Sequence, residues 1–371
     1  MQTDTADEYR ALLQCLRRAL QLNGEPLAFP SAGFAWPCLI ALADRHDVIP
    51  LLNAALRDSD SVPAQVRRQL DSHCRTVIAH NLSLASELAE LLELFERSGI
   101  HAMPFKGPAW TKVLYGNLAY RQIRDLDILL DQSEIERACA LLSERGYVVA
   151  KTQCKDIELE NPGTGLHLEL HWSACEPWHD KRVSGLKLWN AASTISLLNR
   201  RMPLPSAENI FFLLAIHGAR HRWESLKWLC DIAAGLGALP DLDWDVVLSQ
   251  AGKMGRRRLV LLPLALVNQL FDLQLPSSVA KAIEQDAAVA RLAAYIQQRH
   301  YAGPSTAVRR LIYCESMRIR MRESFFERLC LLAAFLFRQI KPNANDRLRP
   351  YRLFRIYGPA TILKFARELM G

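Results

Sequence analysis

Residues 166–171 alternate leucine with a polar residue at every position. Successive side chains of a β-strand point to opposite faces, so this period of two predicts a strand with one apolar and one polar face. The polar face carries His167, Glu169 and His171. A second strand is predicted over Leu126–Leu130, which is mostly apolar. The chain must therefore build a sheet, although most of its remaining sequence has helical periodicity.

Helical patterns flank these strands on both sides. Apolar residues recur at helical spacing in residues 7–22 and 35–98, where Asn81 is a candidate helix start, and again from Pro205 to about residue 300. We expect an α+β fold in which a small mixed sheet is embedded between helical regions. The predicted parts are an N-terminal helical region 1–98, a core 99–202, a helical domain 203–300 that closes the site, and a basic amphipathic helical segment 301–371.

The charge of the chain is concentrated near its end. The 371 residues carry a formal net charge of +7, and from Pro304 onward there are 14 Lys and Arg against five Asp and Glu. Such a segment suits an anionic membrane surface or RNA, or it packs on the body with a solvated basic face. Packing on the body is the default interpretation, because the segment holds many large apolar residues.

Three features predict a cytoplasmic protein without a transmembrane segment. The acidic, polar N-terminus does not resemble a signal peptide. The longest apolar run, 329–337, is far shorter than the roughly 20 residues that span a bilayer. The nine cysteines form no CxxC pair, as is typical of reduced core thiols.

An Asp-x-Asp motif marks the candidate catalytic site. Asp125 and Asp127 are spaced to project from one face of a strand, and Glu169 adds a third carboxylate from a later strand. Hard oxygen ligands of this kind suit divalent ions that hold a triphosphate. The alternative is a solvated strand edge in which Arg124 forms a salt bridge. A transition-metal site made by His167 and His171 is disfavoured, because positions i and i+4 of a strand lie about 13 Å apart.

The order of these motifs resembles the nucleotidyltransferase superfamily related to DNA polymerase β: a strand, a glycine turn that opens a helix, a strand with Asp-x-Asp, and a later strand with one acid. Within it, residues 35–235 resemble a bacterial family of uncharacterised nucleotidyltransferases. The motifs that carry this resemblance are Phe105-Lys106-Gly107-Pro108-Ala109, Tyr115-Gly116, Arg121, Arg124-Asp125-Leu126-Asp127-Ile128-Leu129 and Leu168-Glu169-Leu170-His171-Trp172.

The resemblance implies a minimal nucleotidyltransferase sheet and a role for each motif. Asp125 and Asp127 would bind Mg²⁺ or Mn²⁺, and Glu169 would complete the metal site and activate the acceptor. Lys106 and Gly107 would hold the triphosphate of ATP or another NTP. The sequence departs from the superfamily at Pro108, which stands where a second glycine or a serine usually touches phosphate and which has no N–H to donate.

Further candidates surround these residues. Arg121 and Arg124 are candidates for phosphate binding, and one of them is expected to pair with a carboxylate instead. A helical face after Pro205 is expected either to face the nucleotide or to form a buried polar network. This face and its flanks comprise Arg220, His221, His217, Trp228 and Asp231. The residues expected beside the metal ligands rather than on the ion are His167, His171, His217 and Asp231.

The expected activity is transfer of a nucleoside monophosphate from an NTP to a hydroxyl or phosphate acceptor, with release of pyrophosphate. The acceptor is a small molecule, a peptide or tRNA. A peptide acceptor rests on the resemblance, because relatives lie beside peptide natural-product machinery, and a tRNA acceptor would make the protein toxin-like. The alternative is a non-catalytic nucleotide- or RNA-binding module with a degenerate core, which the Pro108 departure favours.

Overall fold

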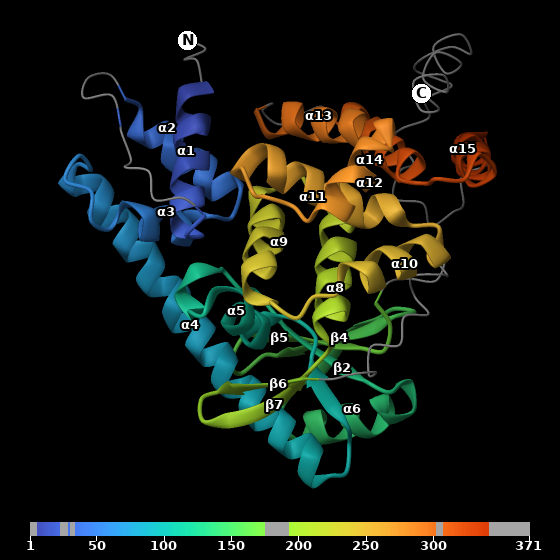
Figure 1. Ribbon diagram of the computed structural model, residues 1–371. Coiled ribbons are helices and arrows are strands. Elements are labelled where there is room, and N and C mark those ends of the chain that lie inside the picture. Colours follow the sequence, from blue (N-terminus) through green and yellow to red (C-terminus); the bar gives the residue numbers. More distant parts are fainter. Residues whose placement is uncertain (1–5, 23–28, 30–33, 175–192, 302–306, 341–371) are drawn as a thin grey trace. The chain divides into compact units, whose positions relative to one another are not determined.

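The computed structural model describes residues 6–22, 29, 34–174, 193–301 and 307–340 (Figure 1). The chain divides into two units. The first comprises residues 1–217, 225–243 and 269–273, and the second comprises residues 218–224, 244–268 and 274–371. Strands occur in the first unit, together with helices, so the predicted α+β class is confirmed.

A five-stranded mixed sheet lies in the first unit. Its strands are β1 (Ala102–Pro104), β2 (Leu126–Leu130), β3 (Val148–Thr152), β4 (Asp156–Asn161) and β5 (Leu166–His171). Their spatial order is β1-β2-β5-β4-β3. The neighbours β2 and β5 run parallel, and the other pairs run antiparallel. The two strands with the clearest sequence pattern therefore lie side by side at the centre of the sheet.

The register between the central strands separates an apolar face from a polar one. Leu126 pairs with Leu168, and Ile128 pairs with Leu170. All four side chains are fully buried. Between these pairs Asp127 stands opposite Glu169, with both side chains on the other face. The leucine alternation thus fixes which face of the sheet carries the acids.

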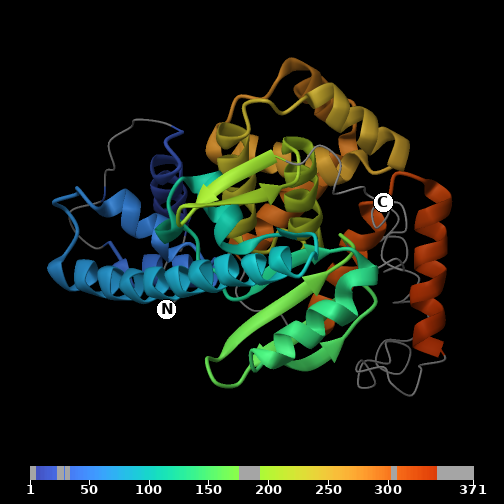
Figure 2. The same ribbon diagram turned by 90° about the horizontal axis from the view of Figure 1, so that it is seen from below.

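The N-terminal helices are α1 (Ala6–Ala19), α2 (Trp36–Arg45), α3 (Ile49–Leu56) and α4 (Ala64–Arg97). Figure 2 shows α4 as the long helix that passes along the first unit, and it contacts β1 and α5. Asn81 lies inside α4 and does not start a helix, so that prediction was wrong. It is fully buried, and its amide donates hydrogen bonds to backbone carbonyls outside the helix, which satisfies the buried polar group.

Further short elements complete the first unit. They are α5 (Gly107–Tyr115), η1 (Leu118–Tyr120), η2 (Gln132–Glu134), α6 (Ile135–Glu144), most of α8 (Ala207–Arg220) and α9 (Leu226–Ala238). Figure 1 shows α6 below the sheet and α9 above it. An unpredicted hairpin joins β6 (Ser193–Leu197) to β7 (Arg200–Leu204). Its turn residues Leu198 and Asn199 both have positive φ, as a two-residue type I′ turn requires.

The second unit is helical within the residues that the structure describes. Its helices are α10 (Trp244–Met254), most of α11 (Arg257–Phe271), α12 (Ser277–Glu284), α13 (Ala287–Tyr301), α14 (Ala307–Arg320) and α15 (Phe325–Ile340). In α15, Leu332 and Phe335 are buried, whereas Phe325 and Phe326 are exposed. Residues 302–306 and 341–371 of the predicted basic amphipathic segment 301–371 lie outside the described part of the chain. None of the described helices has both the length and the apolar content needed to cross a bilayer.

Candidate functional site

The turn after β1 brings Lys106 to the central strand. The Phe105 backbone N–H donates to the Asp127 carbonyl at 2.9 Å, which continues the pairing of β1 with β2. Gly107 follows with φ +69°, a conformation that favours glycine, and begins α5. The Lys106 side chain, 15% exposed, then places its Nζ 2.9 Å from Asp127 Oδ1. The Lys-Gly motif and the Asp-x-Asp motif are thus in direct contact.

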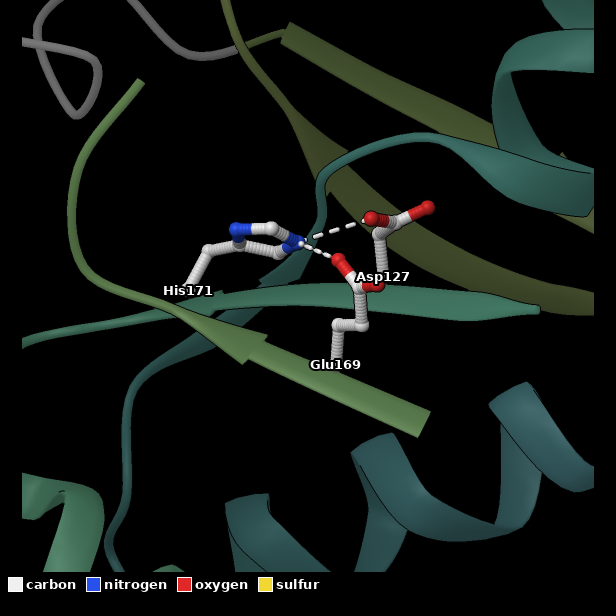
Figure 3. Close-up of side chains that lie close together, drawn as sticks. All are labelled: Asp127, Glu169 and His171. Carbon is white, nitrogen blue, oxygen red and sulfur yellow. Dashed lines mark hydrogen bonds and ion pairs between the residues drawn. The ribbon is translucent and has the colours of Figure 1, made fainter. Parts of the chain in front are cut away.

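Two parallel strands place the acids next to each other and add a histidine. Asp127 on β2 pairs in register with Glu169 on β5. His171, two residues further along β5, turns its Nε2 toward both carboxylates (Figure 3). Nε2 lies 2.7 Å from Asp127 Oδ1 and 3.0 Å from Glu169 Oε2. The predicted meeting of Asp127 with Glu169 is present, and His171 belongs to the same group.

The electrostatics of the three acids differ. Burial, followed by the charges of Asp127 and Glu169, raises the pKa of Asp125 to about 6. Burial also opposes the charged form of Asp127, but the ammonium of Lys106 and the imidazole of His171 prevail and lower its pKa. Burial and the charge of Asp127 oppose the charged form of Glu169, but the hydrogen bond with His171 and the charges of His171 and Lys106 together lower its pKa. The repulsion among the three carboxylates is thus expressed mainly as a raised pKa of Asp125.

Other buried side chains surround the His171 ring on the side away from the two acids. Its ring lies 4.7 Å from the Phe105 ring, and its Nδ1 lies 3.5 Å from Asp156 Oδ2. Asp156 stands opposite His171 in the β4–β5 register and forms an ion pair with Lys155. All of these side chains are buried. Sequence reasoning missed Lys155 and Asp156, because no local pattern shows which β4 residue faces His171.

The donor set suits a divalent cation. One ligand atom each from Asp127, Glu169 and His171 lies within 4.8 Å of the others, and Asp127 and His171 are buried. Carboxylate oxygens and an imidazole nitrogen are ordinary metal ligands. The repulsion that raises the pKa of Asp125 would be relieved by a bound cation. The ligand atoms of Asp127, Glu169 and His171 therefore suit a divalent metal ion.

A buried amide fixes the segment that leads into the Asp-x-Asp motif. Asn81 Nδ2 donates to the carbonyls of Leu118 and Arg121, each at 2.7 Å. Its Oδ1 accepts from the backbone N–H of Ile123 at 3.3 Å. These bonds hold residues 118–123 on α4, two residues before Asp125. The long helix thereby positions the site without contributing a ligand.

Arg121, Tyr115 and Asp231 form a second polar cluster. Arg121 Nε donates to Asp231 Oδ1 at 2.9 Å, and Tyr115 Oη donates to the same oxygen at 2.8 Å. The side chain of Arg121 is 15% exposed and that of Asp231 is 3% exposed. Burial opposes the charge of Arg121, but Asp231 outweighs burial and raises the Arg121 pKa. Arg121 is thus the arginine that pairs with a buried carboxylate.

A pocket of about 340 Å³, open mouth included, lies between these two clusters. The lining residues are Lys106, Gly107, Trp110, Leu114, Arg121, Leu214, His217, Trp228 and Asp231. The rings of His217 and Trp228 meet edge to face with centroids 4.4 Å apart. Trp110 is buried, and its Nε1 has no hydrogen-bond partner among the described residues. The pocket therefore combines aromatic walls with the lysine that touches Asp127.

The four remaining predicted residues are exposed. Arg124 is exposed, and its Nη2 is 2.8 Å from Asp47 Oδ1 rather than near Asp125. His167 is exposed on β5 and is not in the group formed by Glu169 and His171. Arg220 ends α8 and His221 follows it; both are exposed and both belong to the second unit.

Comparison with known proteins gives one family. Residues 32–272 match the model of a family described as "Uncharacterised nucleotidyltransferase". No curated protein is similar enough to count as a relative. A solved structure, an antigenic nucleotidyltransferase-like protein from Paracoccidioides brasiliensis, aligns at 17% identity and a TM-score of 0.34. That alignment covers 55% of this chain and 97% of the other.

Proposed function

The chain belongs to the uncharacterised nucleotidyltransferase family, and we propose that it transfers a nucleoside monophosphate from an NTP to an acceptor. The observation that carries the proposal is the junction of Lys106 with Asp127, Glu169 and His171 on one face of the sheet. Cationic and acidic groups meet there, as the transfer of a charged phosphoryl group requires.

The phosphate end of the substrate is assigned to Lys106 and Gly107. The Lys106 ammonium group is a compact positive charge that contacts Asp127. Gly107 begins α5 and has no side chain to block a phosphate from its backbone. The N-terminus of a helix favours anions. Pro108 supplies no N–H, so Lys106 carries most of the phosphate binding. Arg121 lines the same pocket, where its charge is paired with that of Asp231.

The nucleoside end is assigned to the pocket beside Lys106. The rings of Trp110, His217 and Trp228 offer apolar walls for a base, and Trp110 Nε1 can donate a hydrogen bond to it. Because Lys106 and Gly107 line this pocket too, one nucleotide can reach from the base site to the acids.

The proposed reaction forms one bond and breaks one bond. An oxygen of the acceptor attacks the α-phosphorus, the bond from the α-phosphorus to the bridging oxygen breaks, and pyrophosphate leaves. A divalent ion, when bound, neutralises charge on the phosphates. Asp125, Asp127 and Glu169 would hold it, and Glu169 would also accept the proton of a hydroxyl acceptor. Glu169 suits this step because its side chain is 27% exposed, against 5% for Asp127.

The proposal is tested with α-labelled NTPs, Mg²⁺ or Mn²⁺, and cell extract as the source of acceptor. We expect the wild type to label an acceptor and release pyrophosphate, and Asp127→Asn to lose about a hundredfold to a thousandfold in rate. Asp131→Asn is the matched control, because Asp131 follows the same strand and is exposed. Glu169→Gln serves as a second variant. Equal labelling by wild type and both site variants would exclude these carboxylates as the site.

A second candidate is nucleotide binding without turnover. Pro108 favours it, since the proline removes a phosphate donor, and so does the ion pair between Lys106 and Asp127. In that case calorimetry detects NTP binding that does not change with Mg²⁺, and no pyrophosphate is released.

A further inference from the structure

His171 occupies an unusual place for a histidine of a sheet. Its side chain is 1% exposed, and one ring nitrogen faces two carboxylates from two strands. The ligand atoms of Asp127, Glu169 and His171 lie within 4.8 Å of one another. The alternative to a metal site is a buried hydrogen-bonded network without an ion.

The charge of the cluster favours a cation. Lys106 Nζ lies 2.9 Å from Asp127 Oδ1. The charge of this ammonium group also acts on the carboxylates of Asp125 and Glu169. Arg121 also acts on Asp125, but its guanidinium is paired with Asp231. Counted without the imidazole, the three carboxylates and the one ammonium group carry a net charge of two negative units in a largely buried place. One divalent ion would balance them.

The surroundings of His171 match those of a ligating histidine. Metal-bound histidines usually direct the second ring nitrogen to a carboxylate or carbonyl, which orients the ring and fixes its tautomer. His171 Nδ1 lies 3.5 Å from Asp156 Oδ2, within ion-pair distance but without a hydrogen bond between the two atoms, and Asp156 is in turn paired with Lys155. The Phe105 ring packs against the imidazole. Nε2 is thereby left as the nitrogen that points at the two acids.

We propose that His171 Nε2 is a direct ligand of the divalent ion, together with Asp127 and Glu169, and that Asp156 is its positioning residue. The inference rests on the proposed function for the ion's role, but not for its binding. An imidazole ligand favours first-row transition ions, whereas Mg²⁺ prefers oxygen alone. The site is therefore selective for Mn²⁺ or a later transition ion over Mg²⁺.

The test uses the full chain with Mn²⁺ alone, without nucleotide. Binding is followed by loss of the free Mn²⁺ EPR signal, and the ligand is identified by electron spin echo modulation from a coordinated ¹⁴N. We expect ¹⁴N modulation in the wild type and its loss in His171→Asn. His167→Asn is the matched control, because His167 lies on the same strand but is exposed. Asp156→Asn is expected to keep the modulation and to weaken Mn²⁺ binding by about 10–100-fold.

Selectivity gives a second readout. We expect Mn²⁺ to bind the wild type at least about tenfold more tightly than Mg²⁺, and His171→Asn to lower that ratio. Should His171→Asn fail to fold, wild-type protein labelled with ¹⁵N-histidine replaces it, since the modulation must then change frequency. Wild-type binding of Mn²⁺ without nitrogen modulation, no Mn²⁺ binding, or a preference for Mg²⁺ would each overturn the inference.

These outcomes are separate from those of the proposed function. Nucleotide transfer with an all-oxygen Mn²⁺ site would refute the role of His171 and leave the proposed activity intact. Nitrogen-ligated Mn²⁺ without nucleotide transfer would refute the activity and leave the ligand assignment intact.

Discussion

Replacing Asp125 by asparagine is expected to stabilise the protein when divalent ions are removed. The carboxylate of Asp125 is held near two other carboxylates, and burial and their charges raise its pKa from 3.8 to about 6. Asparagine has nearly the same shape and no charge. Among the described residues no hydrogen bond to the Asp125 carboxylate is found, so the substitution removes repulsion without breaking such a bond.

The magnitude follows from the shift in pKa. One pKa unit corresponds to about 1.4 kcal/mol, so about two units give an upper limit of about 3 kcal/mol. The side chain is partly exposed, and solvent screening lowers the expected gain to about 1–2 kcal/mol. For a unit of this size the melting temperature would rise by about 3–6 °C.

The pH dependence gives the sign. A raised pKa means that the folded state holds the Asp125 proton more tightly than the unfolded state does. The wild type therefore loses stability as pH rises from 3.8 to about 6, and the whole penalty is present above about 6. Asp125→Asn carries no such penalty. The gain should thus be full at pH 8 and disappear near pH 4.

Urea unfolding in EDTA, followed by tryptophan fluorescence, measures this difference. The control is Asp131→Asn, where the Ser133 hydroxyl and backbone N–H lower the pKa of Asp131, so that variant should gain no stability at high pH. Adding Mn²⁺ should stabilise the wild type more than Asp125→Asn. A variant that is less stable than wild type at pH 8, or a difference that does not change with pH, would refute the reasoning.

Two further substitutions test the supports of the site. Arg121→Ala leaves Asp231 buried without its counter-ion, although Tyr115 still donates to it, so we expect a loss of about 3–5 kcal/mol in urea unfolding. Arg124→Ala removes an exposed pair and should cost under about 1 kcal/mol. Equal losses would contradict the assigned burial. Asn81→Ala removes a side chain that binds three backbone groups, and we expect a loss of about 2–4 kcal/mol together with weaker Mn²⁺ binding by EPR. Unchanged Mn²⁺ affinity would show that α4 does not position the acids.

The sequence determined the elements that carry the candidate site. The alternation in residues 166–171 predicted β5 and its buried leucines, and the apolar run 126–130 predicted β2. The alternation can be recognised within a short segment, because successive side chains of a strand point to opposite faces whatever the strand packs against. The same period predicted that Glu169 and His171 share a face, although it could not show that His167 stays exposed at the far end of that face.

The tertiary structure decided which groups touch. The Arg121–Asp231 pair spans 110 residues and the Asn81–Arg121 bond spans 40. The contact of Asp156 with His171 depends on the β4–β5 register. No local pattern encodes such pairs, because strand register and helix packing are set by the whole hydrophobic core. The sequence alone therefore predicts strands that carry Asp127 and Glu169. Only the folded molecule shows that His171 Nε2 faces both carboxylates and that the buried Asp156 lies on the other side of the His171 ring.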